Sequence, residues 1–238
     1  MKIEKILLSF PKKRSLLSNN LQKIYAEHYK KNRDGGTPAS FLAQKLESWM
    51  HKKVARAIPL KKLTTLNTLE IGAGTLNQIS YESANGKYDC IEPMDSLYKN
   101  SSNLPHIQNI FSDISEIDSA IKYNRIISVA VLEHIENLPQ LIKKSIEHMD
   151  DEGIFACSIP SEGGFLWGMA WRLTTGLEFR LRTGLNYSEL MRHEHLNDSL
   201  EIEILLKHYF KDVNIQRLGL GRHFSLYTYI ECKNPKNT

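Results

Sequence analysis

The sequence predicts an α/β fold, in which helices cover both faces of a mostly parallel β-sheet. From Leu66 onward, short apolar runs alternate with segments of helix length, and this alternation is typical of consecutive βαβ units. The first apolar run ends at the glycine pair Gly72 and Gly74, which allows a tight turn after a strand. Residues 1–66 lack this alternation and show helical spacing instead. We therefore expect a helical N-terminal extension followed by one α/β domain, residues 67–238.

The N-terminal extension is predicted to be helical and strongly basic. After a break at Asp34–Gly36, Pro38 suits the first position of a helix, and apolar residues then recur at three and four through about Ala57. Residues 1–66 contain 15 Lys and Arg against 4 Asp and Glu. Such an arm can meet nucleic acid, an anionic membrane surface or an anionic substrate; a solvated surface or a lid over the site is the alternative.

Seven apolar runs in the α/β domain are predicted to be strands, with right-handed crossovers between the parallel ones. They are Thr68–Ile71, Tyr88–Glu92, Ile107–Phe111, Arg125–Val129, Gly153–Ile159, Val213–Leu218 and His223–Cys232. The last two are expected to form a β-hairpin that closes the sheet. The segment Asp198–Glu201 is a capping-type start for a helix through about Tyr209, which leads into this hairpin.

Residues 161–197 interrupt the alternation, and we predict that they form a partly helical insertion that caps a substrate site. This capping segment contains Trp167 and Trp171 and is too long for an ordinary connection. The two tryptophans are four apart, which favours a packed helical face. Its arginines suit a carboxylate or phosphate of a substrate, and a solvated arginine surface is the alternative. They are Arg172, Arg180, Arg182 and Arg192.

Composition restricts the class of protein. Hydrophobic residues make up 41% of the chain and charged residues 24%, which is ordinary for a soluble globular protein. No apolar run approaches the roughly 18 residues of a membrane span, and we expect a cytoplasmic protein. The cysteines Cys90, Cys157 and Cys232 lie in separate apolar runs. They are expected to be buried reduced thiols and not a disulfide framework or a zinc site.

The segment Leu69–Thr75 places a glycine turn directly after a strand, where parallel sheets bind nucleotides. The dinucleotide-binding pattern would need a third glycine where Asn77 stands, and this disfavours a nicotinamide or flavin cofactor. The chain also lacks the Gly-Lys-Ser/Thr sequence of a phosphate-binding loop. The turn is therefore better suited to a nucleoside ligand without a pyrophosphate.

Three carboxylates lie near the carboxyl ends of the first three predicted strands. Glu92 ends the second strand, where an acid can accept hydrogen bonds from ribose hydroxyls. Asp113 follows the third run and can accept the exocyclic amine of adenine, while Ile114 covers the ring face. Glu70 can fix the glycine turn or approach the positively charged part of a sulfonium ligand. Three carboxylates suit a cation better than a phosphate.

At these positions the chain resembles the class I S-adenosylmethionine-dependent methyltransferases. Glu70-x-Gly72-x-Gly74 is similar to the family's first motif, and Arg125–Ile135 is similar to its fourth strand and the loop that follows. The likeness covers about residues 66–160 well and 198–232 loosely. It implies a Rossmann-like seven-stranded sheet, S-adenosylmethionine as methyl donor and S-adenosylhomocysteine as product. The cofactor-binding residues that it implies are Glu70, Gly72, Ala73, Gly74, Glu92, Pro93, Met94, Asp113, Ile114, Val129, Leu132 and Glu133.

Two positions depart from the family's pattern. Leu76 or Asn77 stands where a third glycine is common, and Asn124 stands where an aspartate often precedes the fourth strand. The backbone turn depends most on Gly72 and Gly74, so we expect cofactor binding to persist.

Three histidines are candidates for a catalytic base. Methyl transfer chiefly needs alignment of the acceptor and exclusion of water, and a hydroxyl acceptor must also lose a proton. His134 is the first candidate because it follows the fourth strand, although a cofactor-lining role is the alternative. His193 and His195, at the end of the capping segment, are rivals. The His-x-His spacing also suggests a metal, but no third ligand is evident and we expect no metal.

The leading hypothesis is a methyltransferase that acts on a small polar acceptor. O-methylation of a sugar or a related anionic metabolite fits the arginines and aromatic residues of the capping segment, and cell-surface polysaccharide assembly is one setting. Two alternatives stay open. One is a nucleic-acid methyltransferase that uses the basic arm, and the other is a protein that binds S-adenosylmethionine without transferring the methyl group.

Overall fold

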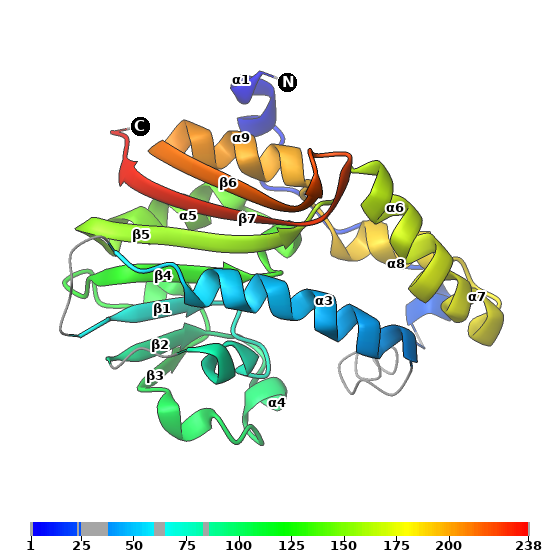
Figure 1. Cartoon of the computed structure of the whole chain (residues 1–238), viewed down its shortest axis with the longest axis horizontal. Helices are drawn as coiled ribbons and strands as arrows, with labels where there is room; N and C mark the ends of the chain where they lie inside the picture. Colours follow the sequence, from blue (N-terminus) through cyan, green and yellow to red (C-terminus); the bar gives the residue numbers. More distant parts are fainter. Residues whose placement is uncertain (1, 23, 25–37, 60–64, 83–85, 238) are drawn as a thin grey trace.

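The computed structural model describes residues 2–22, 24, 38–59, 65–82 and 86–237, and the predicted break at Asp34–Gly36 lies outside these residues. Its centre is a seven-stranded sheet (Figure 1). The strands are β1 (Thr68–Ile71), β2 (Tyr88–Ile91), β3 (Asn109–Phe111), β4 (Tyr123–Val129), β5 (Met149–Pro160), β6 (Phe210–Leu220) and β7 (Phe224–Pro235). All seven predicted strands are confirmed, and only their ends differ by a few residues.

The α-helices precede the sheet, connect its strands or form the capping segment. They are α1 (Ile3–Leu7), α3 (Pro38–Ala55), α4 (Asp95–Tyr98), α5 (Leu138–Glu147), α6 (Phe165–Trp171), α7 (Leu177–Thr183), α8 (Tyr187–Glu194) and α9 (Ser199–Tyr209). Short 3₁₀ helices are η1 (Asn77–Tyr81), η2 (Leu104–His106), η3 (Ile114–Glu116) and η4 (Leu132–His134), and a π-helical turn is η5 (Arg172–Gly176). In the part of the chain that is described, no helix has the length and apolar character needed to cross a membrane.

The strand order is β3-β2-β1-β4-β5-β7-β6. The first five strands are parallel, and β7 runs antiparallel to both β5 and β6. The predicted hairpin of the last two strands is therefore confirmed, and its second strand lies inside the sheet. From β1 the chain continues to β2 and β3 on one side and returns to β4 and β5 on the other. This reversal leaves a crevice at the carboxyl ends of β1 and β4, where open α/β sheets bind ligands.

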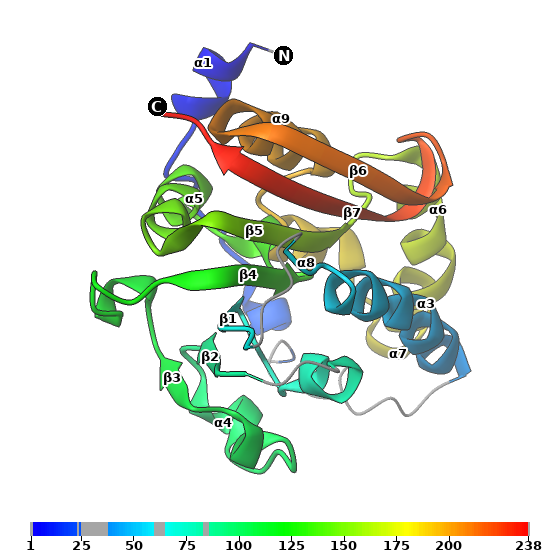
Figure 2. The same cartoon turned by 60° about the vertical axis from the view of Figure 1, so that its left-hand side comes forward.

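Helices cover both faces of the sheet, as Figures 1 and 2 show. Because side chains alternate along a strand, Leu69 and Ile71 of β1 enter a core with α1, α5 and α9. On the other face, Tyr88 and Cys90 of β2 pack in a second core with Val54 of α3. All three cysteines are free and buried.

Helix α9 begins with the predicted capping box. The Asp198 carboxylate accepts the backbone N–H of Glu201 at 2.9 Å, and Glu201 accepts the N–H of Asp198 at 3.2 Å. The Glu201 carboxylate also accepts from Lys12 Nζ at 2.6 Å. Lys12 belongs to residues 12–18, an extended segment that we call the N-terminal strap, and Lys12 Nζ also donates to the carbonyl of Leu196. The helix cap thus anchors the strap beside the end of the capping segment.

Arg125 of β4 is fully buried and joins α3 to the sheet. Its guanidinium donates to both carboxylate oxygens of Glu82, at 2.7 and 2.9 Å, and to the carbonyl of Val54 at 2.9 Å. A bidentate geometry of this kind is what keeps a charge tolerable in an interior. Asn124, the residue before it, accepts the N–H of Asn67 at 2.9 Å, so the amide oxygen fills the acceptor role open to an aspartate there.

Replacing Arg125 is expected to destabilise the fold. Arg125→Met leaves the Glu82 carboxylate buried without its charged partner, and the cost should be about 3–5 kcal/mol in the free energy of unfolding. Urea unfolding followed by circular dichroism measures it. Lys233→Met is the matched control, because Lys233 pairs with Glu231 near the surface and should cost less than about 1 kcal/mol. Equal losses in the two variants would contradict the role given to Arg125.

Candidate active site

A cavity of about 1270 Å³ opens at the carboxyl ends of the parallel strands. Eight of the residues predicted for the site line it. They are Gly72, Glu92, Pro93, Met94, Asp113, Ile114, His134 and His193. These residues come from the loops after β1, β2, β3 and β4 and from the end of α8. The crevice between β1 and β4 thus brings together residues that are far apart in the sequence.

The glycine loop passes very close to the loop after β4. Gly72 has a φ of +70°, and a Cβ at this position would lie 2.5 Å from a methyl group of Val131. Its N–H donates to the carbonyl of Ile91 at 2.8 Å, which ties the loop to the end of β2. Gly74 has a φ of +53°. A side chain at Gly72 would therefore clash with Val131 and would also strain the backbone.

Leu76 takes the left-handed conformation that a glycine adopts without strain. Its φ is +64°, and its side chain is fully buried in the core below α3. A non-glycine residue in this region costs on the order of 1–3 kcal/mol, and burying a leucine side chain contributes a similar amount. Packing thus offsets the missing third glycine. The element that follows is the short 3₁₀ helix η1.

Glu92 holds two loops at the mouth of the cavity. One oxygen accepts the N–H of Gly74 at 2.8 Å, and the other accepts the N–H of Met94 at 3.0 Å. The residue is 7% exposed. Each carboxylate oxygen has a second lone pair, so the group can still accept from a ligand in the cavity.

Asp113 and Ile114 line the cavity beyond the end of β3. The Asp113 carboxylate accepts the N–H of Ser115 at 2.8 Å and also its hydroxyl, and these two hydrogen bonds lower the pKa of Asp113. The side chain of Asp113 is 64% exposed, so its charge faces solvent and the cavity. Ile114 is buried and gives this wall an apolar surface.

The other predicted cofactor residues are not part of the cavity wall. Ala73, Gly74, Val129, Leu132 and Glu133 do not line it, and neither does Glu70. The Glu70 carboxyl accepts a hydrogen bond from the Tyr88 hydroxyl at 2.9 Å, and burial raises its pKa to about 8. It is therefore largely neutral at neutral pH. Direct contact of these residues with a cofactor stays a prediction.

The end of the capping segment meets the loop after β4. His134 Nδ1 lies 2.8 Å from the carbonyl of Glu194, and the rings of His134 and His195 pack edge to face at 4.8 Å. His134 Nε2 is 3.8 Å from the Glu133 carboxylate. Burial raises the pKa of Glu133. Two of the three predicted histidines are thus in direct contact.

His195 lies outside the cavity, and its Nδ1 contacts the carboxylate of Glu162. Burial lowers the pKa of His195, but the hydrogen bond with Glu162 and the nearby carboxylates outweigh it and the pKa is raised. His193 lines the cavity, and its Nδ1 lies 2.6 Å from the carbonyl of Ser15 in the N-terminal strap. In the described residues, no cluster of His, Cys, Asp and Glu has the form of a metal site.

The strap supplies a site residue that the sequence analysis missed. Arg14 lines the cavity, and its guanidinium donates to the carbonyls of His134 and His193 at 3.2 and 3.4 Å. It also lies 3.7 Å from the carboxylates of Glu136 and Glu194. No local pattern near Arg14 indicates this role, because its partners are more than 100 residues away. Ala130 and Val131 also line the cavity, and their place directly after a strand was the signal that could have found them.

Known proteins with similar sequence or structure agree with this geometry. Residues 39–214 match the family described as "Methyltransferase domain". The chain belongs to this methyltransferase family. The predicted family is therefore confirmed. A comparison with curated proteins found no match for this methyltransferase.

Several solved methyltransferase structures share its fold. The plantazolicin methyltransferase BpumL, in complex with a monoazolic desmethylPZN analogue and SAH, is 16% identical over 98% of this chain and 99% of its own, with a TM-score of 0.59. The N-methyltransferase NodS from Bradyrhizobium japonicum, in complex with SAH, is 15% identical over 92% and 100%, with a TM-score of 0.54. The CurJ carbon methyltransferase is 17% identical over 92% and 62%, with a TM-score of 0.57.

The raised pKa of Glu70 predicts a pH-dependent stability. In the unfolded methyltransferase this carboxyl loses its proton near pH 4.5, whereas the folded protein keeps it up to about pH 8. The wild type should therefore lose stability as the pH rises between these values. Glu70→Gln removes this loss. The unfolding free energy of the variant minus that of the wild type should therefore increase by a few kcal/mol between pH 4.5 and pH 8.

Urea unfolding at a series of pH values measures this difference. Glu178→Gln, at an exposed position of α7, is the control and should leave the pH profile of the wild type unchanged. Parallel profiles for the wild type and Glu70→Gln would show that Glu70 ionises normally in the folded protein.

Proposed function

We propose that this methyltransferase transfers a methyl group from S-adenosylmethionine to a hydroxyl of a small polar acceptor, such as a sugar or a related anionic metabolite. One observation carries the proposal. A single cavity joins Gly72, Glu92 and Asp113, which suit a nucleoside, to His134 and His193, which suit a polar acceptor. Donor and acceptor in such a cavity would be neighbours, and proximity is the main requirement of methyl transfer.

The residues on the cofactor side fit S-adenosylmethionine. Glu92 keeps lone pairs free for ribose hydroxyls, and the exposed carboxylate of Asp113 can accept the adenine amine while Ile114 covers the ring. Gly72 lines the cavity with a φ of +70°, so the turn would present its backbone to the amino-acid part of the cofactor. When bound, the cofactor supplies a methyl group that its sulfonium has already activated. The bound SAH in the similar structures of BpumL and NodS supports this assignment.

His134 is the best placed of the three histidines to act as a base. The carbonyl of Glu194 can only accept, so Nδ1 of a neutral His134 carries the proton and Nε2 keeps its lone pair. Nε2 can then take the proton of an acceptor hydroxyl. The nearby Glu133 would stabilise the imidazolium that forms. His195 is less suited, because its Nδ1 is engaged by the Glu162 carboxylate and it lies outside the cavity.

The acceptor side of the cavity is polar and basic. Arg14, His193, Asn137 and Gln140 line it, and these side chains suit the hydroxyls and negative charge of a sugar-like acceptor. We propose that residues 161–197 bound the acceptor through the end of α8 and not through their arginines. Arg172, Arg180, Arg182 and Arg192 do not line the cavity. The N-terminal strap would exclude water beside His134.

Asp113→Ala is expected to weaken binding of S-adenosylhomocysteine at least about tenfold, because a hydrogen-bonded carboxylate on a ligand is worth on the order of 1.5–3 kcal/mol. Calorimetry measures the dissociation constant. Asp118→Ala is the matched control, since Asp118 accepts the N–H of Ala120 in the same way but lies outside the cavity. Normal affinity in Asp113→Ala, or an equal loss in both variants, would remove support for this cofactor pose.

His134→Ala should leave S-adenosylhomocysteine binding within about twofold and slow methyl transfer by about 10²-fold or more. The assay follows S-adenosylhomocysteine release with a panel of sugars, nucleotide sugars and other hydroxyl metabolites. His106→Ala, at an exposed position of η2, is the control. An unchanged rate in His134→Ala would move the base to His193. Tight cofactor binding with no turnover on any acceptor would favour the non-catalytic alternative.

A further inference from the structure

The capping helices carry a row of apolar side chains on their outer surface. Phe165, Met169, Leu173, Leu177 and Leu181 follow one another at every fourth position, and each is between 40% and 79% exposed. The row spans about 24 Å of helix. Soluble proteins normally scatter such residues singly. A row of five at constant spacing is therefore a feature that needs a reason.

The π-helical turn η5 keeps this row in line. In a regular α-helix, residues four apart advance around the axis, and five of them would wind through about 160°. The turn Arg172–Gly176 lies in the middle of the row, and its wider i→i+5 hydrogen bonds unwind the helix there. The apolar side chains on the two sides of the turn consequently stay closer to one face.

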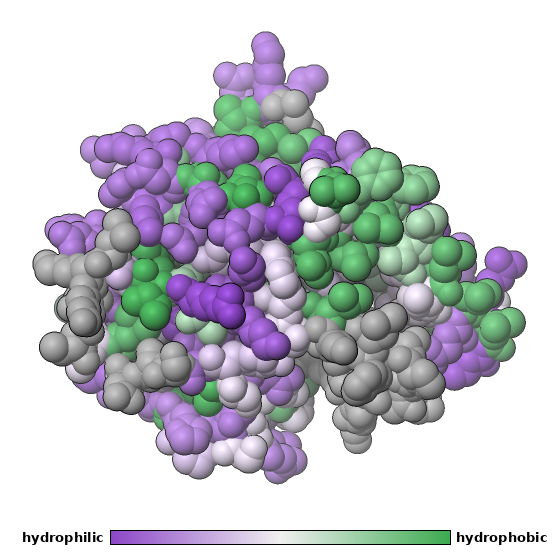
Figure 3. Space-filling view, viewed as in Figure 1, coloured by the Kyte–Doolittle hydropathy of each residue, from purple (hydrophilic) through white to green (hydrophobic). Residues whose placement is uncertain are grey.

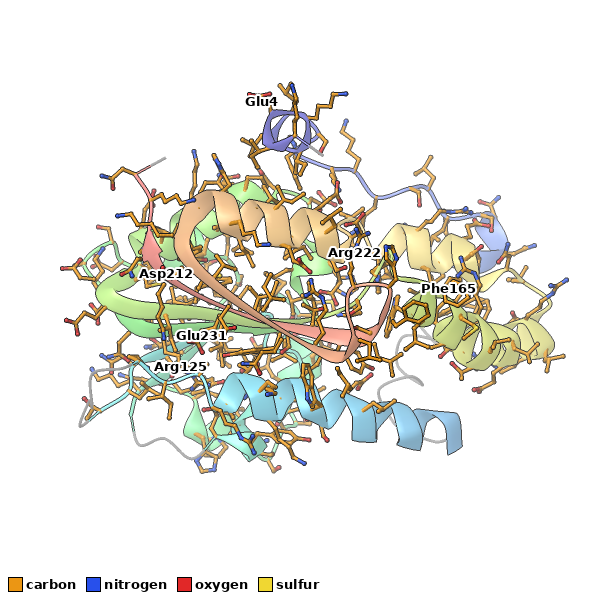
Figure 4. All side chains as sticks on the ribbon, turned by 45° about the horizontal axis from the view of Figure 1, so that its top comes forward. Glu4, Arg125, Phe165, Asp212, Arg222 and Glu231 are labelled. Atoms are coloured by element: carbon orange, nitrogen blue, oxygen red, sulfur yellow. The ribbon has the colours of Figure 1, made fainter. Side chains whose placement is uncertain are left out.

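The turn between β6 and β7 extends the row into a patch. Phe165 packs against Phe224 with ring centroids 6.1 Å apart, and the N–H of Leu166 donates to the carbonyl of His223 at 2.8 Å. Phe224 is 58% and Leu220 84% exposed. Figure 3 shows apolar residues gathered over α6, the β6–β7 turn and α7, and Figure 4 shows Phe165 close to the turn that carries Arg222.

The exposed apolar side chains of the row are not the ones that pack the capping helices against the rest of the protein. The inner face of these helices is already packed, because Trp167 contacts Tyr227 and Trp171 contacts Tyr187, as expected for two tryptophans four apart. Phe179 is buried. Of twelve large apolar side chains that are exposed in the described residues, seven belong to the outer patch. Folding therefore does not explain the patch, which points to a partner.

The charges around the patch are mostly positive. Arg172 and Arg180 are exposed on the same helices, with Glu178 as the nearby acid on α7. Arg182 follows, and Arg222 lies on the β6–β7 turn. Arginines beside a row of leucine and phenylalanine are typical of helices that lie in the surface of an anionic membrane. An interface with a second copy would bring these positive charges together.

We propose that this patch docks the protein on the surface of a membrane that contains anionic lipids. Phe165, Leu173, Leu177 and Leu181 would enter the boundary between headgroups and acyl chains, and the arginines would contact lipid phosphates. Helices α6 and α7 lie at one end of the molecule, beyond the end of the sheet (Figure 1). The patch residues do not line the cavity, so this docking is independent of the transfer reaction.

Co-sedimentation with vesicles tests the proposal. The full chain should bind vesicles of equal parts phosphatidylcholine and phosphatidylglycerol, and should bind them less at high salt. Leu173→Ser/Leu181→Ser should lower the partition coefficient at least about tenfold. Leu8→Ser/Leu16→Ser removes two leucines elsewhere that are even more exposed and should not change it. Circular dichroism and the melting temperature verify that both variants are folded.

A second pair of variants tests the charges. Arg172→Gln/Arg180→Gln should weaken binding to the anionic vesicles, whereas Lys99→Gln/Lys211→Gln, at exposed positions outside the patch, should not. Equal losses in matched pairs, or equal binding to pure phosphatidylcholine vesicles, would overturn the proposal. So would sedimentation of the wild type as a dimer that Leu173→Ser/Leu181→Ser dissociates, without vesicle binding; that result would assign the patch to a second copy of the chain.

Discussion

The place where the strand order reverses, between β1 and β4, is the constraint on which the rest of the site depends. These strands are hydrogen-bonded in register, with Ile71 opposite Ser128, but their crossovers leave toward opposite edges of the sheet. No helix can cover both carboxyl ends, so a crevice opens there. Loops from four parallel strands enter it, and they lie so close together that Gly72 contacts Val131 where a Cβ would not fit. The cavity is therefore a consequence of topology, and its chemistry comes from residues at the strand ends.

Contacts inside the protein compensate for the two departures from the family's pattern. Leu76 takes the backbone conformation of a glycine, and its buried side chain compensates for the strain. Asn124 accepts a backbone N–H through its amide oxygen. The interior also contains a charge, because Arg125 is completely enclosed and its two terminal nitrogens donate to Glu82 and to a carbonyl of α3. In each case a tertiary contact outweighs a local preference of the residue.

Local patterns were sufficient to predict the strands, the capping box of α9 and the cavity residues Glu92 and Asp113. Strand length and apolar runs are local, and parallel strands end at one edge, so residues after them converge. What the sequence did not reveal depends on distant contacts. Arg14 enters the cavity because Lys12 is held by Glu201, far along the chain. Glu70 faces Tyr88 and not the cavity, because alternation along β1 turns it away. His134 and His195 meet only because α8 ends beside η4.

The position of β7 inside the sheet has a consequence for the order of assembly during synthesis. Strand β6 is joined to the sheet only through β7, which follows it in the chain and fills the gap beside β5. The parallel strands leave the ribosome first. One edge of β5 stays unpaired, and β6 has no neighbouring strand, until Phe224–Pro235 has been synthesised. Open edges of this kind attract other strands. The edge of β5 is therefore covered only once β7 pairs with it, after the residues of the candidate active site have already been synthesised.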